Sequence, residues 1–149
     1  MKVRLPLFCQ KGRMELNRFY DVHTSDFDTA LAEVRRSRKV SHWMWYIFPQ
    51  LKGLGYSSTA HFYGLDGLAE ARRFAADEIL GEGLRTITKA LLDQPQRNAN
   101  GIFGATDAMK LRSCMTLFEL ADPTCSLYGQ VLEEFFGGSR DHKTLNMLK

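Results

Sequence analysis

The chain has 149 residues, 44% of them hydrophobic and 25% charged, which is typical of one globular domain that buries its own core. A formal charge of +3 and a pI of about 8.8 are only mildly basic, which argues against a dedicated nucleic-acid-binding protein. The three cysteines form no C-x-x-C pair, and no apolar run approaches the roughly 18 residues of a membrane span. We therefore expect no disulfide framework, no metal site, no cofactor and no membrane association.

The N-terminal segment "MKVRLPLFCQKGR" lacks the apolar stretch and the cleavage site of a signal peptide. Met14 offers a second plausible start, so residues 1–13 are predicted to be a flexible extension and residues 14–149 a single domain. The absence of a secretory signature predicts a cytoplasmic protein.

Apolar residues recur with helical spacing along most of the chain. Ser25 is predicted to cap a helix from about Asp26 to Arg38, and the basic "RRSRK" is interpreted as its solvated C-terminal end. Two helices are expected within "GLAEARRFAADEILGEGLRTITKALLDQ", with a break around Gly81 to Gly83.

Three more helices are expected in the second half of the chain. One begins after a cap at Thr106 or Asp107 and ends before Pro123, one in "SLYGQVLEEFFGG" stops at the Gly-Gly pair, and a short one lies in "RDHKTLNMLK". The predicted fold is all-α: a compact, irregular, mostly orthogonal domain of about six to eight helices, without the long straight helices of an up-and-down bundle.

The segment "SHWMWYIFPQLKGLG", residues 41–55, contains both tryptophans of the chain. As a helix turn capped by Ser41, it would direct Trp43 and Ile47 into the core and His42, Trp45 and Tyr46 toward a cleft. Gln50 and Lys52 would add polar groups to that cleft. The alternative, that the whole segment is core, stays open.

Two further groups of polar residues have open interpretations. Ser57 or Ser58 either caps the helix that carries His61 and Tyr63, or belongs with the preceding glycines to an anion-binding loop. The helix after Ala108 is so apolar that it is expected to be largely buried, and its polar residues form two narrow strips, one with Arg112, Thr116 and Glu119 and the other with Lys110 and Ser113. Arg112 either pairs with Glu119 or a distant carboxylate, or these cations face an anionic ligand or an acidic partner.

Four motifs together resemble the domain-of-unknown-function family 1810, whose bacterial members often carry the label calpastatin. They are "SHWMWYIFPQLKGLG", "FYG", "LRSCMTLFE" and "DHKTLNML", and the resemblance covers about Leu16 to Leu148. Tyr46 and Cys114 depart from the family pattern, and Cys114 weakens any role that rests on a serine pair. The resemblance implies a compact helical cytosolic domain without established enzymatic activity, and its eukaryotic branch is associated with chaperoning a translation elongation factor.

Two hypotheses for function remain. In the first, the chain is a non-enzymatic, chaperone-like module that binds a protein client through the aromatic segment and its basic flank, Arg36, Arg38 and Lys39. In the second, it is a receptor or enzyme for a small anionic ligand, a nucleotide or nucleotide-sugar phosphate, whose binding side chains converge on one concavity. No catalytic residue can be named from the sequence, and whether the chain is an enzyme stays open. The candidate binding residues are His42, Trp45, Tyr46, Gln50, Lys52, Ser57, Tyr63, Lys110, Arg112 and Ser113.

Overall fold

The structure, a computed structural model, describes residues 7–149, with side chains described from residue 16 onward. The helices of this part are α1 (Leu7–Arg35), α2 (Met44–Ile47), α3 (Ser58–Tyr63), α4 (Leu68–Ala76), α5 (Leu80–Leu92), α6 (Ala99–Phe103), α7 (Ala105–Ala121), α8 (Leu127–Phe136) and α9 (His142–Met147). The predicted all-α class is confirmed. Within the described residues the β structure is limited to one isolated bridge between Leu51 and Leu65.

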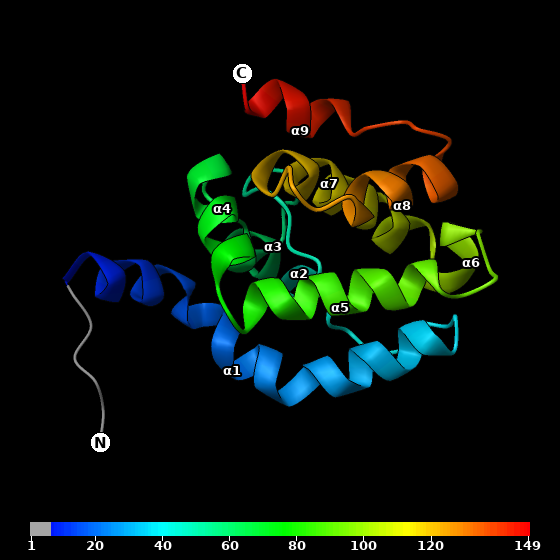
Figure 1. The fold of residues 1–149 in the computed structure, drawn as a ribbon, viewed down its shortest axis with the longest axis horizontal. Helices are drawn as coiled ribbons and strands as arrows, with labels where there is room; N and C mark the ends of the chain where they lie inside the picture. The colour runs from blue at the N-terminus through cyan, green and yellow to red at the C-terminus, as the bar shows by residue number, and fades with distance from the viewer. Residues whose placement is uncertain (1–6) are drawn as a thin grey trace.

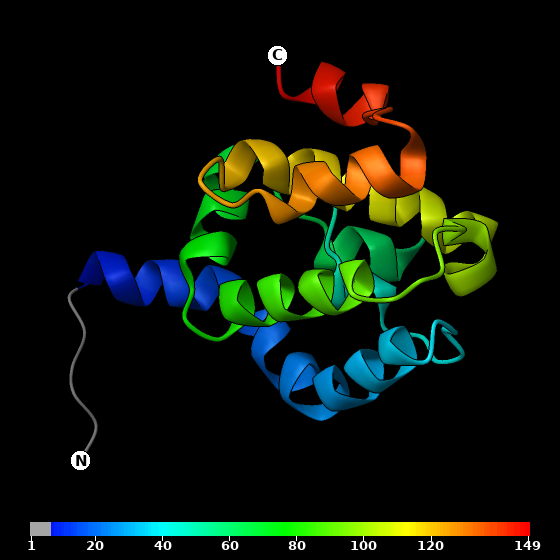
Figure 2. The same ribbon diagram turned by 45° about the vertical axis from the view of Figure 1, so that its right-hand side comes forward.

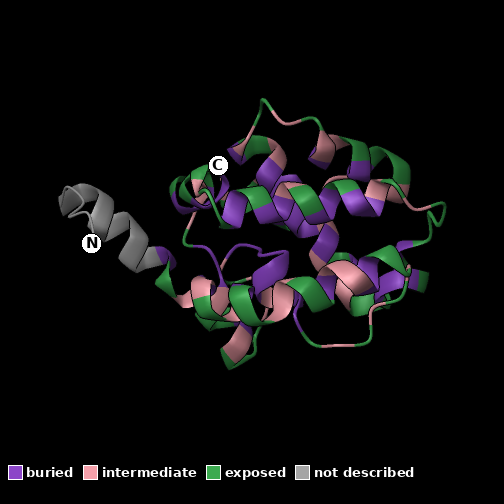
Figure 3. Ribbon diagram, turned by 60° about the horizontal axis from the view of Figure 1, so that its bottom comes forward, coloured by how far each residue is buried: buried purple, intermediate pink, exposed green. Residues whose placement is uncertain are grey.

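Helix α7 lies at the centre of the domain. It contacts α4, α6, α8 and α9, while α1 and α5 pack side by side along another face (Figure 1). In both ribbon views α9 lies outside the α7 and α8 pair (Figure 2). Figure 3 shows the buried residues on the inward faces of the helices and the exposed residues on their outer faces. The prediction that the helix after Ala108 is largely buried is confirmed.

The described residues form nine helices, where about six to eight were predicted. Four of the nine have six residues or fewer; α2, α3 and α9 were expected, whereas the five residues of α6 are too few for apolar periodicity to identify. Helix α1, at 29 residues, is longer than any helix expected. It bends between its two halves, so that its second half can lie along α5 (Figure 1).

Helix α1 does not begin at Ser25, as the sequence predicted. Ser25 lies inside the helix, where its hydroxyl donates a hydrogen bond to the Val22 carbonyl at 3.2 Å. The helix continues upstream because Leu16 and Phe19 are buried in the core, so packing outweighs the local capping signal. Residues 1–6 of the predicted flexible extension lie outside the described residues, and that extension stays a prediction.

The break predicted at Gly81 to Gly83 is also misplaced. Helix α4 ends at Ala76 and α5 begins at Leu80, so both glycines lie within α5. A Cβ atom on Gly81 would collide with the carbonyl oxygen of Ala75, and one on Gly83 would lie 2.5 Å from Nε2 of His23. These glycines therefore permit close approach of neighbouring chain segments rather than ending a helix.

The segment between α1 and α2 is fixed by one buried carboxylate. Glu33, 1% exposed, accepts hydrogen bonds at Oε1 from the backbone N–H groups of Val40 (2.7 Å) and Ser41 (2.9 Å) and from Nε1 of Trp43 (3.1 Å). Its Oε2 accepts the Ser41 hydroxyl at 2.6 Å. Ser41 thus does not cap a helix as predicted, and α2 begins only at Met44.

These hydrogen bonds make the stability of the fold depend on pH. Burial alone would raise the pKa of the Glu33 carboxyl, but its four hydrogen bonds outweigh burial and lower the pKa from 4.5 to about 2. A folded-state pKa below the unfolded value contributes stability above pH 4.5 that is lost as the pH falls toward 2. The difference corresponds to roughly 3 kcal/mol.

We predict that Glu33→Gln lowers the free energy of unfolding at pH 7 by a few kcal/mol, about the value above. The variant should also lose less stability than the parent between pH 5 and pH 3. Urea denaturation at pH 7, 5 and 3 measures both effects, with the exposed Glu78→Gln as control. A Glu33→Gln protein with the parent's stability and acid dependence would contradict the assigned role.

Candidate ligand-binding site

Two residues of the aromatic segment, Trp43 and Ile47, lie in the core as predicted. Trp43 and Ile47 are 1% and 2% exposed. The Trp43 ring packs against the rings of Phe48 and Phe103, with centroids 6.2 and 6.5 Å away. Trp43 is therefore a core residue.

The three residues predicted to face one cleft point to different places. His42 is exposed, and Trp45 lies under the ammonium group of Lys110, 4.4 Å from the ring centroid. Tyr46 is buried, donates a hydrogen bond to the Asp26 carboxylate, and packs on Tyr63. The prediction that these three residues share one face is wrong. Helix α2 is a single turn that does not include His42, and its consecutive residues point to different sides.

Tyr46 and Tyr63 belong to a contact among α1, α2 and α3. Burial, and then the hydrogen bond to Asp26, raise the pKa of the Tyr46 phenol, and burial and the nearby Asp26 charge raise that of Tyr63. Both phenols therefore stay protonated at neutral pH. The structure gives this pair a packing role.

Ser57 and Lys52 also have structural partners. Ser57 caps α3, because its hydroxyl accepts the N–H of Ala60 at 3.1 Å, as one of the two interpretations predicted. Lys52 pairs with Asp66 at 2.9 Å, and this hydrogen-bonded ion pair lowers the pKa of the Asp66 carboxyl. Neither side chain lines the cleft described next.

Gln50, Lys110 and Ser113 converge on one concavity of about 210 Å³, which we name the Gln50 cleft. It lies between the loop after α2, the first half of α7, and the start of α9. The residues that line it are Gln50, Leu54, Gly55, Thr106, Met109, Lys110, Ser113, Asp141 and Lys143.

The Gln50 side chain is a polar group of this cleft that makes no hydrogen bond within the described residues. Its backbone is held in place, since its carbonyl accepts the N–H of Leu65 at 2.9 Å. The residue is 8% exposed, and its side-chain amide has no hydrogen-bond partner among the described residues, but its amide nitrogen and oxygen are not themselves buried and are open to the solvent of the cleft. A molecule in the cleft could therefore form hydrogen bonds with this amide without displacing a protein partner.

Two lysines share one carboxylate beside the cleft. Asp107 lies 2.8 Å from Nζ of Lys39 and 3.3 Å from Nζ of Lys110. The Lys39 side chain is only 7% exposed and lies over Trp43. One excess positive charge therefore remains next to Gln50.

The second ion pair beside the cleft, between Arg112 and Asp141, has no net charge. Arg112 lies 3.8 Å from Asp141, so the prediction of a distant carboxylate holds, whereas the alternative partner, Glu119, pairs with Arg140 at 2.7 Å. Lys143, exposed at the cleft mouth, adds another cation. The charged residues of the lining are Lys110, Lys143 and Asp141; with the ion-pair partners beside them, Lys39, Arg112 and Asp107, the group has a net charge of +2.

The Ser113 hydroxyl donates to the Met109 carbonyl at 3.1 Å, and no histidine lines the cleft to act as its base. Among the described residues, no three His, Cys, Asp or Glu side chains form a group that could hold a metal ion.

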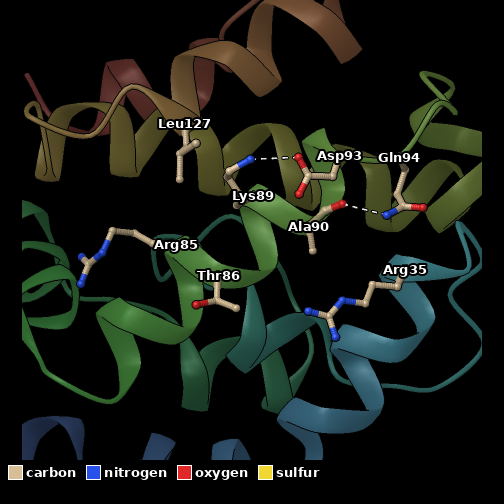
Figure 4. Close-up of a pocket in the computed structure, with 8 residues that line it drawn as sticks. All are labelled: Arg35, Arg85, Thr86, Lys89, Ala90, Asp93, Gln94 and Leu127. Atoms are coloured by element: carbon tan, nitrogen blue, oxygen red, sulfur yellow. Dashed lines mark hydrogen bonds and ion pairs between the residues drawn. The ribbon is translucent and has the colours of Figure 1, made fainter.

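A larger concavity of about 400 Å³ lies among α1, α5 and α8 (Figure 4). Its polar groups do not converge. Lys89 bonds to Asp93 at 2.9 Å, and in Figure 4 the Arg85 guanidinium points away from the other lining residues, whereas that of Arg35 points toward the middle of the view. Arg85 also lies 3.6 Å from Asp122. The Gln50 cleft is therefore the better candidate site.

The sequence missed the contribution of α9 to the site. Asp141 is the N-cap of α9, where its carboxylate accepts the N–H of Thr144 at 3.0 Å. A capping signal in "RDHKT" identifies the helix start, but not its position beside Lys110. The contact with α7 brings Asp141 and Lys143 there.

Fold and site together define a compact all-α domain that carries a polar, net-positive cleft beside its central helix. The chain belongs to the family described as Protein of unknown function (DUF1810), whose model matches residues 13–148. This confirms the family resemblance noted in the sequence.

A solved structure supports the same fold. It is the crystal structure of the conserved hypothetical protein Rv1873 from Mycobacterium tuberculosis, which superposes on this chain with a TM-score of 0.88. The two sequences are 36% identical, and the alignment covers 90% of this chain and 96% of that one. No curated protein matches the chain. In the described part, none of the helices combines the length and the apolar character that crossing a membrane requires.

The two tryptophans should respond differently to truncation. Trp43→Ala should cost about 3 to 5 kcal/mol of unfolding free energy, since it empties a core site. Trp45→Ala should cost less, because Trp45 is only partly buried, but it removes the ring under Lys110. Urea denaturation of both variants measures the difference, and equal losses would contradict it.

Proposed function

We propose that the protein binds a small anionic ligand, or the anionic group of a larger one, in the Gln50 cleft. The observation that carries this proposal is the Gln50 amide, which faces the cleft, has no partner among the described residues and lies beside an excess positive charge. An anion with hydrogen-bond acceptors would satisfy the amide and the charge together.

The volume of the cleft limits what it can enclose. Sites for drug-sized ligands usually measure about 300 to 1,000 Å³, whereas this cleft measures about 210 Å³. It suits a phosphate or carboxylate group with a few attached atoms. A nucleotide or nucleotide-sugar phosphate would place one phosphate inside and the rest outside.

A second candidate function is a chaperone-like protein-binding module that uses the basic flank of the aromatic segment. It is favoured by the exposure of Arg36 and Arg38 beyond the end of α1, next to Val40, which is 62% exposed. Lys39 does not belong to this surface because it is engaged with Asp107. Binding to an acidic partner that is lost in Arg36→Glu/Arg38→Glu would favour this candidate.

Thermal denaturation with acetate, inorganic phosphate, AMP and ADP tests the anion proposal. We expect at least one of them to stabilise the parent protein, since a ligand at 100 times its dissociation constant adds about 2.7 kcal/mol. Gln50→Leu and Lys110→Met should lose that stabilisation, whereas Gln130→Leu, a change at an exposed glutamine, should keep it.

Gln50→Leu provides a second readout that separates binding from structure. Without ligand, the variant should stay within about 1 kcal/mol of the parent, because the amide that it removes makes no hydrogen bond within the described residues. A strongly destabilised variant would indicate a structural role for Gln50. Failure of all four anions to stabilise the parent would contradict the proposal.

A further inference from the structure

Exposed apolar side chains lie on the segments that form the Gln50 cleft or adjoin it. Met109, 64% exposed, lines the cleft, and Tyr56, 97% exposed, directly follows Gly55. Met147, 48% exposed, lies over the same loop, since its Cε is 3.3 Å from the position of a Cβ on Gly53. We name Tyr56, Met109 and Met147 the apolar rim.

The apolar rim indicates what kind of ligand would fit, because it lies beside a charged cleft. Of the seven large hydrophobic side chains exposed in the described part, three are in this rim. An inorganic ion would leave them in water, whereas a ligand with an anionic group and an apolar body would cover them. Tyrosine and methionine are enriched in protein interfaces, and methionine adapts its shape to different partners.

The charge in the cleft indicates a carboxylate rather than a phosphate. Lys39 and Lys110 share Asp107, and Arg112 is engaged with Asp141, so the interior has one excess positive charge. A carboxylate carries one negative charge, whereas a phosphate ester carries up to two. The guanidinium of Arg112, the group that would hold a phosphate bidentately, already faces Asp141.

A free chain terminus combines the two features that the cleft and its rim require. Its carboxylate is attached directly to the last residue, so a single short segment can present the charge and an apolar side chain at adjacent positions. Capture of a C-terminal carboxylate is a recurrent mode of peptide recognition. The small volume of the cleft fits a chain end better than a whole nucleotide.

We infer that the ligand of the Gln50 cleft is the C-terminal carboxylate of a partner polypeptide whose last residues are apolar, with those residues packed on Tyr56, Met109 and Met147. This inference rests on the proposed function and specifies its ligand. The carboxylate accepts hydrogen bonds from the Gln50 amide, and Lys110 supplies the opposite charge.

The test uses two pools of heptapeptides that vary among Leu, Ile, Val, Phe and Met at the last three positions. One pool ends in a free carboxylate and the other in an amide. Both are passed over the immobilised full-length protein, and the captured peptides are quantified by mass spectrometry. We expect the carboxylate pool to be enriched about tenfold or more over the amide pool. Equal capture of the two pools, or capture of neither, would overturn the inference.

Variants at exposed positions test the apolar rim without disturbing the core. Tyr56→Ser and Met109→Ser should each lower capture of the carboxylate pool about fivefold, whereas Ile79→Ser, at an exposed site between α4 and α5, should not. Unchanged capture by both rim variants would also overturn the inference.

The Gln50→Leu variant separates this inference from the proposed function. It should abolish the preference for the free carboxylate. If acetate or phosphate stabilises the parent through Gln50 but no peptide is captured, this inference fails and the proposed function stands. If peptides are captured equally by the parent and by Gln50→Leu, the peptides bind outside the cleft and this inference fails; both proposals fail if, in addition, none of the four anions stabilises the parent.

Discussion

The buried carboxylate of Glu33 determines where the unusual aromatic segment lies. It accepts hydrogen bonds from the backbone N–H groups of Val40 and Ser41 and from the indole N–H of Trp43, and these bonds hold the segment against the end of α1. Trp43 then packs against Phe48 just before the turn that carries Gln50. An ionised buried group is unfavourable unless its hydrogen bonds are complete, and the four bonds to Glu33 meet that requirement.

The Gln50 cleft shows the opposite situation. The Gln50 backbone is fixed by the bridge to Leu65, while its side-chain amide faces the cleft that Lys110 also lines and has no partner among the described residues. The amide thus adds no hydrogen bond to the fold and is available to a ligand. The contrast between a fully satisfied Glu33 and an unsatisfied Gln50 is the physical basis for assigning structure to one and ligand binding to the other.

The sequence predicted best those features that depend on neighbouring residues: the helical class, the core position of Trp43, the Ser57 cap and the Gly-Gly stop after α8. It misplaced the start of α1 and the break near Gly81, because tertiary packing outweighed a serine and two glycines there. Gln50, Lys110 and Ser113 were identified as polar residues within apolar runs. Asp141 and Lys143 were missed, since they join the site only through the contact between α7 and α9.

The side-chain amide resonance of Gln50 in the ¹H–¹⁵N NMR spectrum, assigned by its disappearance in Gln50→Leu, tests the central claim most directly. A titration with sodium acetate at constant ionic strength should shift this resonance in a saturable manner, together with the backbone amides of Ser113 and Lys143, while the side-chain resonance of Gln130 stays in place. A titration in which the Gln50 amide does not move, or moves no more than that of Gln130, would contradict the assignment of this cleft as an anion-binding site.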